Sequence, residues 1–204
     1  MQIKVCGLKY KENIAAVVSL QPDYIGFVFY RGSPRDVSTD ATLASFVRPI
    51  KQVQKVGVFV NAGREEILEA VAAFGLDLVQ LHGSEPPGFC ALLQQRILVV
   101  KAFAVNETID DAVLHSYRNC CRYFLFDSSA GGSGQSFDWR LLQDRDVPRP
   151  FFLSGGIGTD NMNKAVQLPN KTLMGIDVNS RLETAPGLKN IQSLQTLIHE
   201  IRTR

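Results

Sequence analysis

Eight short apolar runs, separated by longer amphipathic segments, constrain the fold of this chain more than any other feature. The runs are rich in Val, Ile and Phe, and they are continuous rather than alternating, which is typical of strands covered by helices on both faces. They cover Ile3 to Leu8, Tyr24 to Phe29, Val53 to Val60, Leu76 to His82, Ile97 to Val105, Tyr123 to Ser128, Phe151 to Gly156 and Gly175 to Ser180.

The intervening segments have the length and pattern of crossover helices. Several begin at a residue that commonly caps a helix, such as Thr39, Asp138 or Asn190. The predicted helices are Lys11 to Leu20, Thr39 to Arg48, Arg64 to Phe74, Pro86 to Gln95, Glu107 to Tyr117, Asp138 to Leu142, Asp160 to Leu168 and Asn190 to Arg202.

Eight strand-then-helix units without a change of composition predict one α/β domain over residues 1 to 204, a (β/α)8 TIM barrel. A doubly wound open sheet uses the same units and is the alternative. In a barrel, the active site lies at the C-terminal ends of the strands. Residues at or just after the predicted strand ends are therefore the candidates for function.

Composition excludes several classes of partner. The chain has 204 residues, 22 Lys and Arg against 20 Asp and Glu, and no run of like charges, so we expect no nucleic-acid or membrane partner. The N-terminus lacks a signal-peptide pattern, and no apolar stretch approaches the length of a membrane span. The four cysteines form neither a disulfide framework nor a zinc motif, which favours reduced thiols in the cytoplasm and no metal.

Two segments near the predicted ends of strands seven and eight indicate a phosphate site. Gly155 and Gly156 let the backbone approach an anion, and Asn179 and Ser180 follow the last strand, where barrels commonly hold phosphate. Glycines that only turn the chain are the plainer interpretation. The glycine-rich segment 131–134 lacks the lysine of a nucleotide-binding P-loop and is predicted to be a mobile lid or a plain flexible loop.

Seven motifs occur in an order and spacing that resemble the phosphoribosylanthranilate isomerase family of tryptophan biosynthesis. They are KVCGL at 4–8, SPR at 33–35, VGVFVN at 56–61, QLHG at 80–83, FDSSAGGSG at 126–134, SGGI at 154–157, and DVNSRLE at 177–183 followed by PGLKN. The resemblance covers almost the whole chain. It implies an Amadori rearrangement of a small phosphorylated aminosugar by acid–base catalysis, with no cofactor.

The resemblance also implies roles for particular residues. Cys6 is expected to be the general base and Asp127 the general acid, although a buried cysteine is more often core filling. Arg35 is expected to pair with the anthranilate carboxylate, unless it is a solvated loop residue. His82 is expected to line the substrate pocket, and Asp177 either faces the substrate or is a buried structural aspartate.

The chain departs from the family pattern at Arg181, where glycine is often found. Arginine there either adds a charged contact to the phosphate or points into solvent. Two further interpretations stay open: another phosphosugar-converting barrel enzyme, such as a metal-dependent epimerase or indole-glycerol-phosphate synthase, and a non-catalytic barrel that binds a phosphorylated ligand. Barrels of this kind occur as monomers and homodimers, and the sequence does not distinguish the two oligomeric states.

Overall fold

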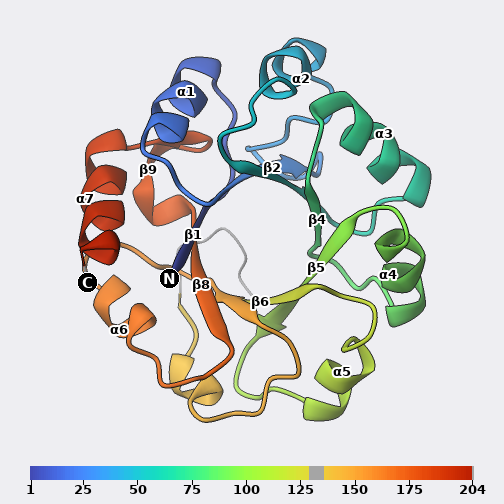
Figure 1. The fold of residues 1–204 in the computed structure, drawn as a ribbon, viewed down its shortest axis with the longest axis vertical. Helices are drawn as coiled ribbons and strands as arrows, with labels where there is room; N and C mark the ends of the chain where they lie inside the picture. The colour runs from blue at the N-terminus through green and yellow to red at the C-terminus, as the bar shows by residue number, and fades with distance from the viewer. Residues whose placement is uncertain (129–135, 204) are drawn as a thin grey trace.

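Eight parallel strands pair in chain order and close into a barrel, as the computed structural model of residues 1–128 and 136–203 shows (Figure 1). Strand β1 pairs with both β2 and β8, and Ile3 lies opposite Ile176 where the barrel closes. An open sheet would leave this edge unpaired, so the barrel prediction is confirmed. The strands are β1 (Gln2–Val5), β2 (Tyr24–Phe29), β3 (Gln54–Phe59), β4 (Leu78–Leu81), β5 (Leu98–Val105), β6 (Tyr123–Ser128), β7 (Phe151–Leu153) and β8 (Leu173–Val178).

Burial on both faces explains why the strands are continuously apolar. All six residues of β2 are buried. On the inner face, the ring of Tyr24 meets that of Phe152 across the barrel at 5.3 Å. On the outer face, Phe27 and Phe29 pack against Phe74 of a covering helix at 5.9 and 4.9 Å. Each strand therefore contributes to two cores, one inside the barrel and one between the barrel and its helices.

The helices surround the barrel in Figure 1. They are α1 (Lys11–Ser19), α2 (Ala41–Val47), α3 (Arg64–Phe74), α4 (Pro87–Gln94), α5 (Asp111–Ser116), α6 (Met162–Val166) and α7 (Ile191–Arg202), with 3₁₀ helices η1 (Trp139–Leu142) and η2 (Ser180–Leu182). A two-stranded hairpin of β9 (Glu183–Ala185) and β10 (Leu188–Lys189) follows η2 and was not predicted.

Most predicted helices match those observed to within two residues at each end, and two differ by more or in type. The helix predicted from Glu107 begins at Asp111, because the side chain of Asp110 accepts the N–H groups of Ala112 and Val113 and so caps it. The α-helix predicted over Asp138 to Leu142 is wrong, because the segment forms one 3₁₀ turn, which is too short for i to i−4 hydrogen bonds to repeat. The predicted lid at 131–134 lies outside the described residues.

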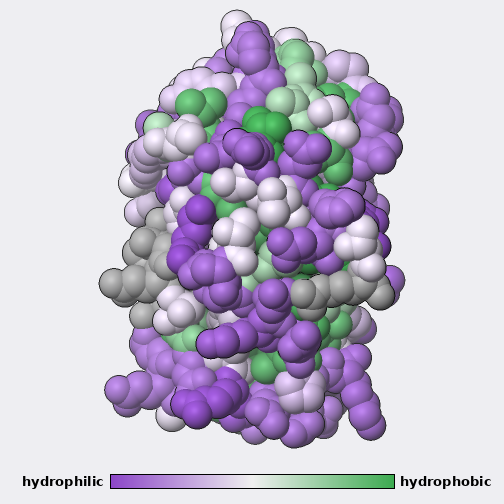
Figure 2. Space-filling view, turned by 90° about the vertical axis from the view of Figure 1, so that its left-hand side faces the viewer, coloured by the Kyte–Doolittle hydropathy of each residue, from purple (hydrophilic) through white to green (hydrophobic). Residues whose placement is uncertain are grey.

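The face of the molecule in Figure 2 is mainly hydrophilic, and its apolar side chains are interrupted by polar ones. Within residues 1–128 and 136–203, no helix combines the length and apolar character that crossing a bilayer requires. The parallel arrangement brings the C-terminal ends of all eight strands to one end of the barrel, and the loops that follow them meet there.

Candidate active site

A cavity of about 290 Å³ opens at the C-terminal ends of the strands, and a recess of about 20 Å³ adjoins it. Asp127, Ser154, Asp177 and Asn179 line both. The structure brings together all ten residues expected at the site: Cys6, Arg35, His82, Asp127, Asp177 and Asn179 line the cavity, and Gly155, Gly156, Ser180 and Arg181 line the recess.

Cys6 lies immediately after β1, and two glycines shape its surroundings. Its N–H donates to the carbonyl of Val178 at 2.9 Å, so its backbone continues the pairing of β1 with β8. Gly7 has φ +75°, and a Cβ there would lie 2.6 Å from Oδ1 of Asn179. A Cβ on Gly26 of β2 would lie 2.7 Å from Sγ of Cys6. The glycine that follows Cys6 therefore turns the chain, and Gly26 makes room for the thiol.

A buried ion pair lies beside Cys6. Nζ of Lys4 donates to Oδ1 of Asp177 at 2.9 Å, and both side chains are almost fully buried, at 2% and 5% exposure. Burial alone would lower the pKa of Lys4, but the carboxylate of Asp177 and the sulfur of Cys6 outweigh it and raise that pKa. The ammonium of Lys4 is therefore held in its charged form next to the thiol.

The charges around Cys6 act on it in opposite directions. Burial raises the pKa of the Cys6 thiol, because the thiolate is poorly solvated there. The ammonium of Lys4 opposes this rise, the carboxylate of Asp177 adds to it, and the ammonium of Lys189 opposes it. The two lysines thus favour the thiolate form that a general base requires.

Asp127 ends β6 and contacts His82, which follows β4. Oδ2 of Asp127 lies 3.4 Å from Nε2 of His82, and its Oδ1 accepts the N–H of Ser128 at 2.8 Å. Nδ1 of His82 lies 2.9 Å from Nε2 of Gln80. When the amide of Gln80 donates to Nδ1, the imidazole carries its proton on Nε2, facing Asp127. Gln80 and His82 therefore form a chain that orients the carboxyl group of Asp127.

Arg35 is held by Glu183 rather than exposed in its loop. Nε and Nη2 of Arg35 donate to the Glu183 carboxylate at 2.6 to 3.1 Å. Glu183 also accepts from Nζ of Lys189 at 2.7 Å, and Lys189 donates to Oδ1 of Asn179 at 2.7 Å. Burial would raise the pKa of Glu183, but Arg35 and Lys189 outweigh it and lower that pKa. A charged network thus connects Arg35 to the wall beside Cys6.

The recess is shaped by the loop after β7. Gly155 has φ +85°, and a Cβ there would lie 3.1 Å from the backbone nitrogen of Ser128. Glycine at this position therefore lets the β7 loop pass close to the end of β6. The amide of Asn161 bridges the loop, accepting the N–H of Gly158 and donating to the carbonyl of Gly156, both at 2.8 Å. The recess therefore has a defined backbone geometry before any ligand enters it.

The side chain of Arg181 is held against the β7 loop and points neither freely into solvent nor into the cavity. Its Nη1 donates to the carbonyl of Gly156 at 3.1 Å, and its Nη2 pairs with Oδ2 of Asp160 at 2.9 Å. The side chain is about one third exposed. The guanidinium thus lies across the glycine loop and adds positive charge to the rim of the recess.

Sequence reasoning missed several residues that contact the site residues, and five of them are Lys4, Gln80, Ser154, Glu183 and Lys189. Each lies inside one of the motifs that carried the resemblance, so the motifs contained the signal. Lys4 and Glu183, however, have partners that are 173 and 148 positions away, Asp177 and Arg35.

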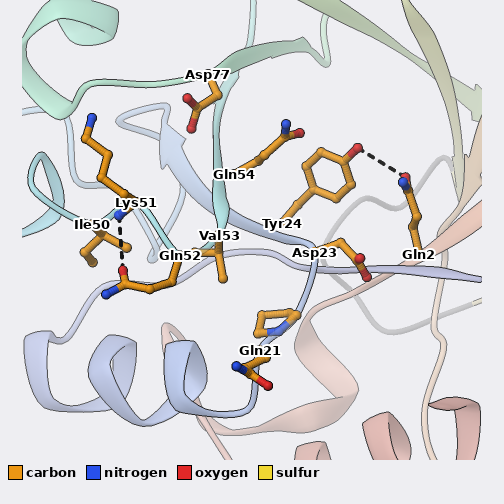
Figure 3. A pocket seen from close by; sticks show the side chains of 11 residues that line it. Gln2, Gln21, Asp23, Tyr24, Ile50, Lys51, Gln52, Val53, Gln54 and Asp77 are labelled. Carbon is orange, nitrogen blue, oxygen red and sulfur yellow. Dashed lines mark hydrogen bonds between the residues drawn. The ribbon is translucent and has the colours of Figure 1, made fainter.

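A larger cavity, of about 560 Å³, lies at the opposite end of the barrel, where the strands begin (Figure 3). Its polar side chains hold the strand starts together: Asp23 accepts the N–H of Ile3 at 2.8 Å, and Asp77 accepts that of Lys55 at 2.8 Å. The hydroxyl of Tyr24 contacts Oε1 of Gln2 at 3.1 Å, as Figure 3 shows. These groups have structural partners, which is typical of the stabilising end of a barrel.

Known proteins resemble this chain over its whole length, in sequence and in fold. A protein from Phocaeicola vulgatus, named N-(5'-phosphoribosyl)anthranilate isomerase, is 38% identical over 100% of this chain and 99% of its own length. The phosphoribosyl anthranilate isomerase structure from Thermotoga maritima superposes with a TM-score of 0.85 at 33% identity, covering 100% of both chains.

A further solved phosphoribosyl anthranilate isomerase contains reduced 1-(o-carboxyphenylamino)-1-deoxyribulose 5-phosphate. It covers 100% of both chains at 32% identity with a TM-score of 0.83. The family model described as N-(5'phosphoribosyl)anthranilate (PRA) isomerase matches residues 3–200. The chain therefore belongs to the N-(5'-phosphoribosyl)anthranilate isomerase family.

Proposed function

We propose that this protein converts N-(5-phosphoribosyl)anthranilate to 1-(2-carboxyphenylamino)-1-deoxyribulose 5-phosphate, with Cys6 as general base and Asp127 as general acid. One observation carries the proposal: a thiol and a carboxyl group, from β1 and β6, line one cavity beside a glycine-walled recess. Because β1 and β6 are not neighbours in the barrel, the two groups reach a bound sugar from different walls.

The rearrangement consists of proton transfers alone. Asp127 donates a proton to the ring oxygen of the furanose, and the bond between that oxygen and C1 breaks to give a Schiff base. The Cys6 thiolate then removes the proton from C2, which gives an enolamine. The enolamine becomes the ketone when its C2 hydroxyl loses a proton and C1 gains one. Exchange with solvent returns Cys6 to the thiolate and Asp127 to the acid.

The base is assisted by its neighbours. Burial disfavours the Cys6 thiolate, while the ammonium groups of Lys4 and Lys189 stabilise it. The thiolate is the form that accepts a proton, and nearby positive charge is the usual device for increasing its population. We therefore assign Lys4 and Lys189 to charge support of the base.

The acid is positioned through His82. With Gln80 holding Nδ1, the imidazole presents Nε2 to Oδ2 of Asp127 at 3.4 Å. The N–H of Ser128 occupies Oδ1 at 2.8 Å. Both contacts restrict the rotation of the carboxyl group, and such orientation contributes to catalysis by keeping the proton donor near the reacting oxygen.

The two ends of the substrate would be recognised by different groups. Glu183 occupies Nε and Nη2 of Arg35, so the edge that carries Nη1 is the one directed to the anthranilate carboxylate. The phosphate would lie in the recess of Gly155, Gly156 and Ser180, with the Arg181 guanidinium at its rim. This arrangement supports a phosphorylated small-molecule substrate.

An enzyme of the indole-glycerol-phosphate synthase type would need a lysine as a catalytic acid. Both buried lysines near this site have carboxylate partners instead, Lys4 with Asp177 at 2.9 Å and Lys189 with Glu183 at 2.7 Å. They therefore fit the role of counter-ions. The proposed reaction also requires no cofactor, and the four cysteines are unpaired thiols, which fits a reducing compartment such as the cytoplasm.

The test follows the loss of anthranilate-type fluorescence when the protein meets freshly generated phosphoribosylanthranilate in the presence of a metal chelator. We expect turnover by the wild type, and a loss of several orders of magnitude in kcat for Cys6→Ala and Asp127→Asn. The affinity of both variants for a reduced product analogue should stay close to that of the wild type, because neither change removes a contact to the carboxylate or phosphate. Wild-type turnover by either variant would refute its assigned role.

A matched control uses the histidines. His82 contacts Asp127, whereas His115 is exposed on α5. The proposal expects His82→Asn to lower kcat and His115→Asn to leave it unchanged.

A further inference from the structure

Three cysteine sulfurs that are distant in sequence converge on the outside of the barrel. Cys90 lies in α4, and Cys120 and Cys121 lie in the connection between α5 and β6. The three Sγ atoms all lie within 4.8 Å of one another. Figure 1 shows α4 and α5 side by side around the barrel. All three side chains are buried, and Cys120 is the most exposed of them at 5%.

This cysteine cluster is independent of the catalytic cavity. Its residues belong to the apolar core between the strands and the helices, whereas Cys6 belongs to a separate group inside the barrel with Val28 and Val58. The proposed reaction uses none of the three. A small apolar side chain would fill each of these positions as well as cysteine does. Packing alone therefore does not require three thiols to converge here.

The spacing of the sulfurs suits a metal ion. A metal–sulfur bond of about 2.3 Å places the sulfurs about 3.8 Å apart around a tetrahedral ion and about 4.0 Å apart around a trigonal one. Sulfurs that already lie within 4.8 Å of one another need to move by less than about an ångström to reach either arrangement. Side-chain rotation alone covers such a movement.

The charge of the site favours a divalent ion. Three thiolates and a divalent cation have a net charge of −1, whereas three thiolates and a monovalent cation have a net charge of −2. The neighbouring Cys121 is the main cause of the lowered pKa of Cys90, and the ammonium of Lys101, held by Oε2 of Glu85 at 2.9 Å and the carbonyl of Gly83 at 2.7 Å, lowers that pKa further. Positive charge is therefore fixed beside the sulfurs, although Glu85 offsets part of it.

We propose that Cys90, Cys120 and Cys121 form a binding site for one soft divalent cation, held by three thiolates. On binding, each thiol releases its proton to solvent and its sulfur forms a bond to the metal. The thiol of Cys120 gives up its hydrogen bond to the carbonyl of Tyr117, which measures 3.4 Å. No imidazole or carboxylate joins the three sulfurs within residues 1–128 and 136–203, so water is the fourth ligand of a tetrahedral ion. Thiolate ligands select soft ions over Mg²⁺ or Ca²⁺.

The test titrates Cd²⁺ into the reduced protein and follows the ultraviolet charge-transfer absorbance of cadmium–thiolate bonds. We expect the absorbance to saturate at one ion per chain and the melting temperature to rise. Mg²⁺ at the same concentration should produce neither effect. Because metal and protons compete for the same sulfurs, the absorbance should weaken as the pH falls.

Variants identify the ligands. Cys6→Ser should keep the full absorbance, because Cys6 lies inside the barrel. Cys120→Ser should lose a large part of it, and this variant changes the least buried of the three sulfurs, so it is the one most expected to fold. Circular dichroism confirms that each variant is folded. The proposal is refuted if the folded wild type gives no absorbance, if Cys120→Ser keeps all of it, or if Cys6→Ser loses it.

Discussion

Gly26→Ala should impair the proposed reaction by displacing the thiol of Cys6. Gly26 lies in β2, and a Cβ added there would stand 2.7 Å from Sγ of Cys6, 3.1 Å from its Cα and 3.3 Å from its Cβ. Because two of these atoms belong to the side chain and one to the backbone, no single rotation relieves all three contacts. We expect Cys6 and the start of its loop to move away from β2.

The size of the effect follows from these distances. Non-bonded heavy atoms pack at about 3.5 to 4.0 Å, so the sulfur has to move by about 1 Å. A displacement of about 1 Å in a reacting group costs roughly two orders of magnitude in rate. Overpacking should also cost about 1–3 kcal/mol of the free energy of unfolding. We therefore expect kcat to fall roughly a hundredfold in a protein that still folds.

Gly57→Ala is the matched control. Gly57 lies in the neighbouring strand β3, and its added Cβ would meet Cδ1 of Leu76 at 2.5 Å and Cε2 of Phe59 at 2.7 Å, in the outer core. This variant should lose a similar free energy of unfolding in urea but keep its kcat for phosphoribosylanthranilate. The reasoning fails if Gly26→Ala is folded and turns over at the wild-type rate, or if both variants lose kcat equally.

Three further changes test the charged groups around the site. Lys4→Met removes a cation that stabilises the Cys6 thiolate, so the pKa of Cys6 should rise, and the limb of the pH–rate profile on which kcat/KM increases with deprotonation of Cys6 should move to higher pH. Arg35→Lys cannot keep the paired contacts to Glu183 at 2.6 to 3.1 Å, so urea unfolding should show a loss of about 1–3 kcal/mol and kinetics a higher KM. Arg181→Gly removes positive charge from the rim of the recess, so inorganic phosphate should inhibit several-fold more weakly while kcat changes little.

The positions of the strands were predictable because their periodicity is a property of short stretches of sequence. Once the barrel was predicted, the residues at the strand ends followed, and this is why Cys6, Asp127 and Asp177 were placed at one end correctly. The 3₁₀ turn at Trp139–Leu142 was not predictable in the same way, since a segment this short carries too little periodic signal to separate a 3₁₀ turn from an α-helix.

The partners of the site residues were beyond sequence reasoning because they are set by the closure of the barrel. Lys4 meets Asp177 only because β1 pairs with β8, which are separated by 173 positions at this contact. Arg35 meets Glu183 across 148 positions, through a hairpin that was not predicted. The cysteine cluster also depends on tertiary packing, since Cys90 of α4 and Cys121 of the α5–β6 connection lie in neighbouring units of the barrel.

The buried charges divide the cavity into two chemically different walls. Beside Cys6, Lys4 of β1 and Lys189 of β10 stabilise a negative sulfur, and their carboxylate partners, Asp177 and Glu183, keep these cations from standing unpaired in a buried site. On the opposite wall, Asp127 has His82 as its neighbour, oriented by Gln80 rather than by a second charge. Nearby positive charge favours the deprotonated form that a base requires, whereas beside an acid it would favour loss of the proton that the acid has to donate. The two cations therefore lie beside the proposed base, while the His82–Gln80 pair contacts the proposed acid, so one cavity gives the two groups different surroundings.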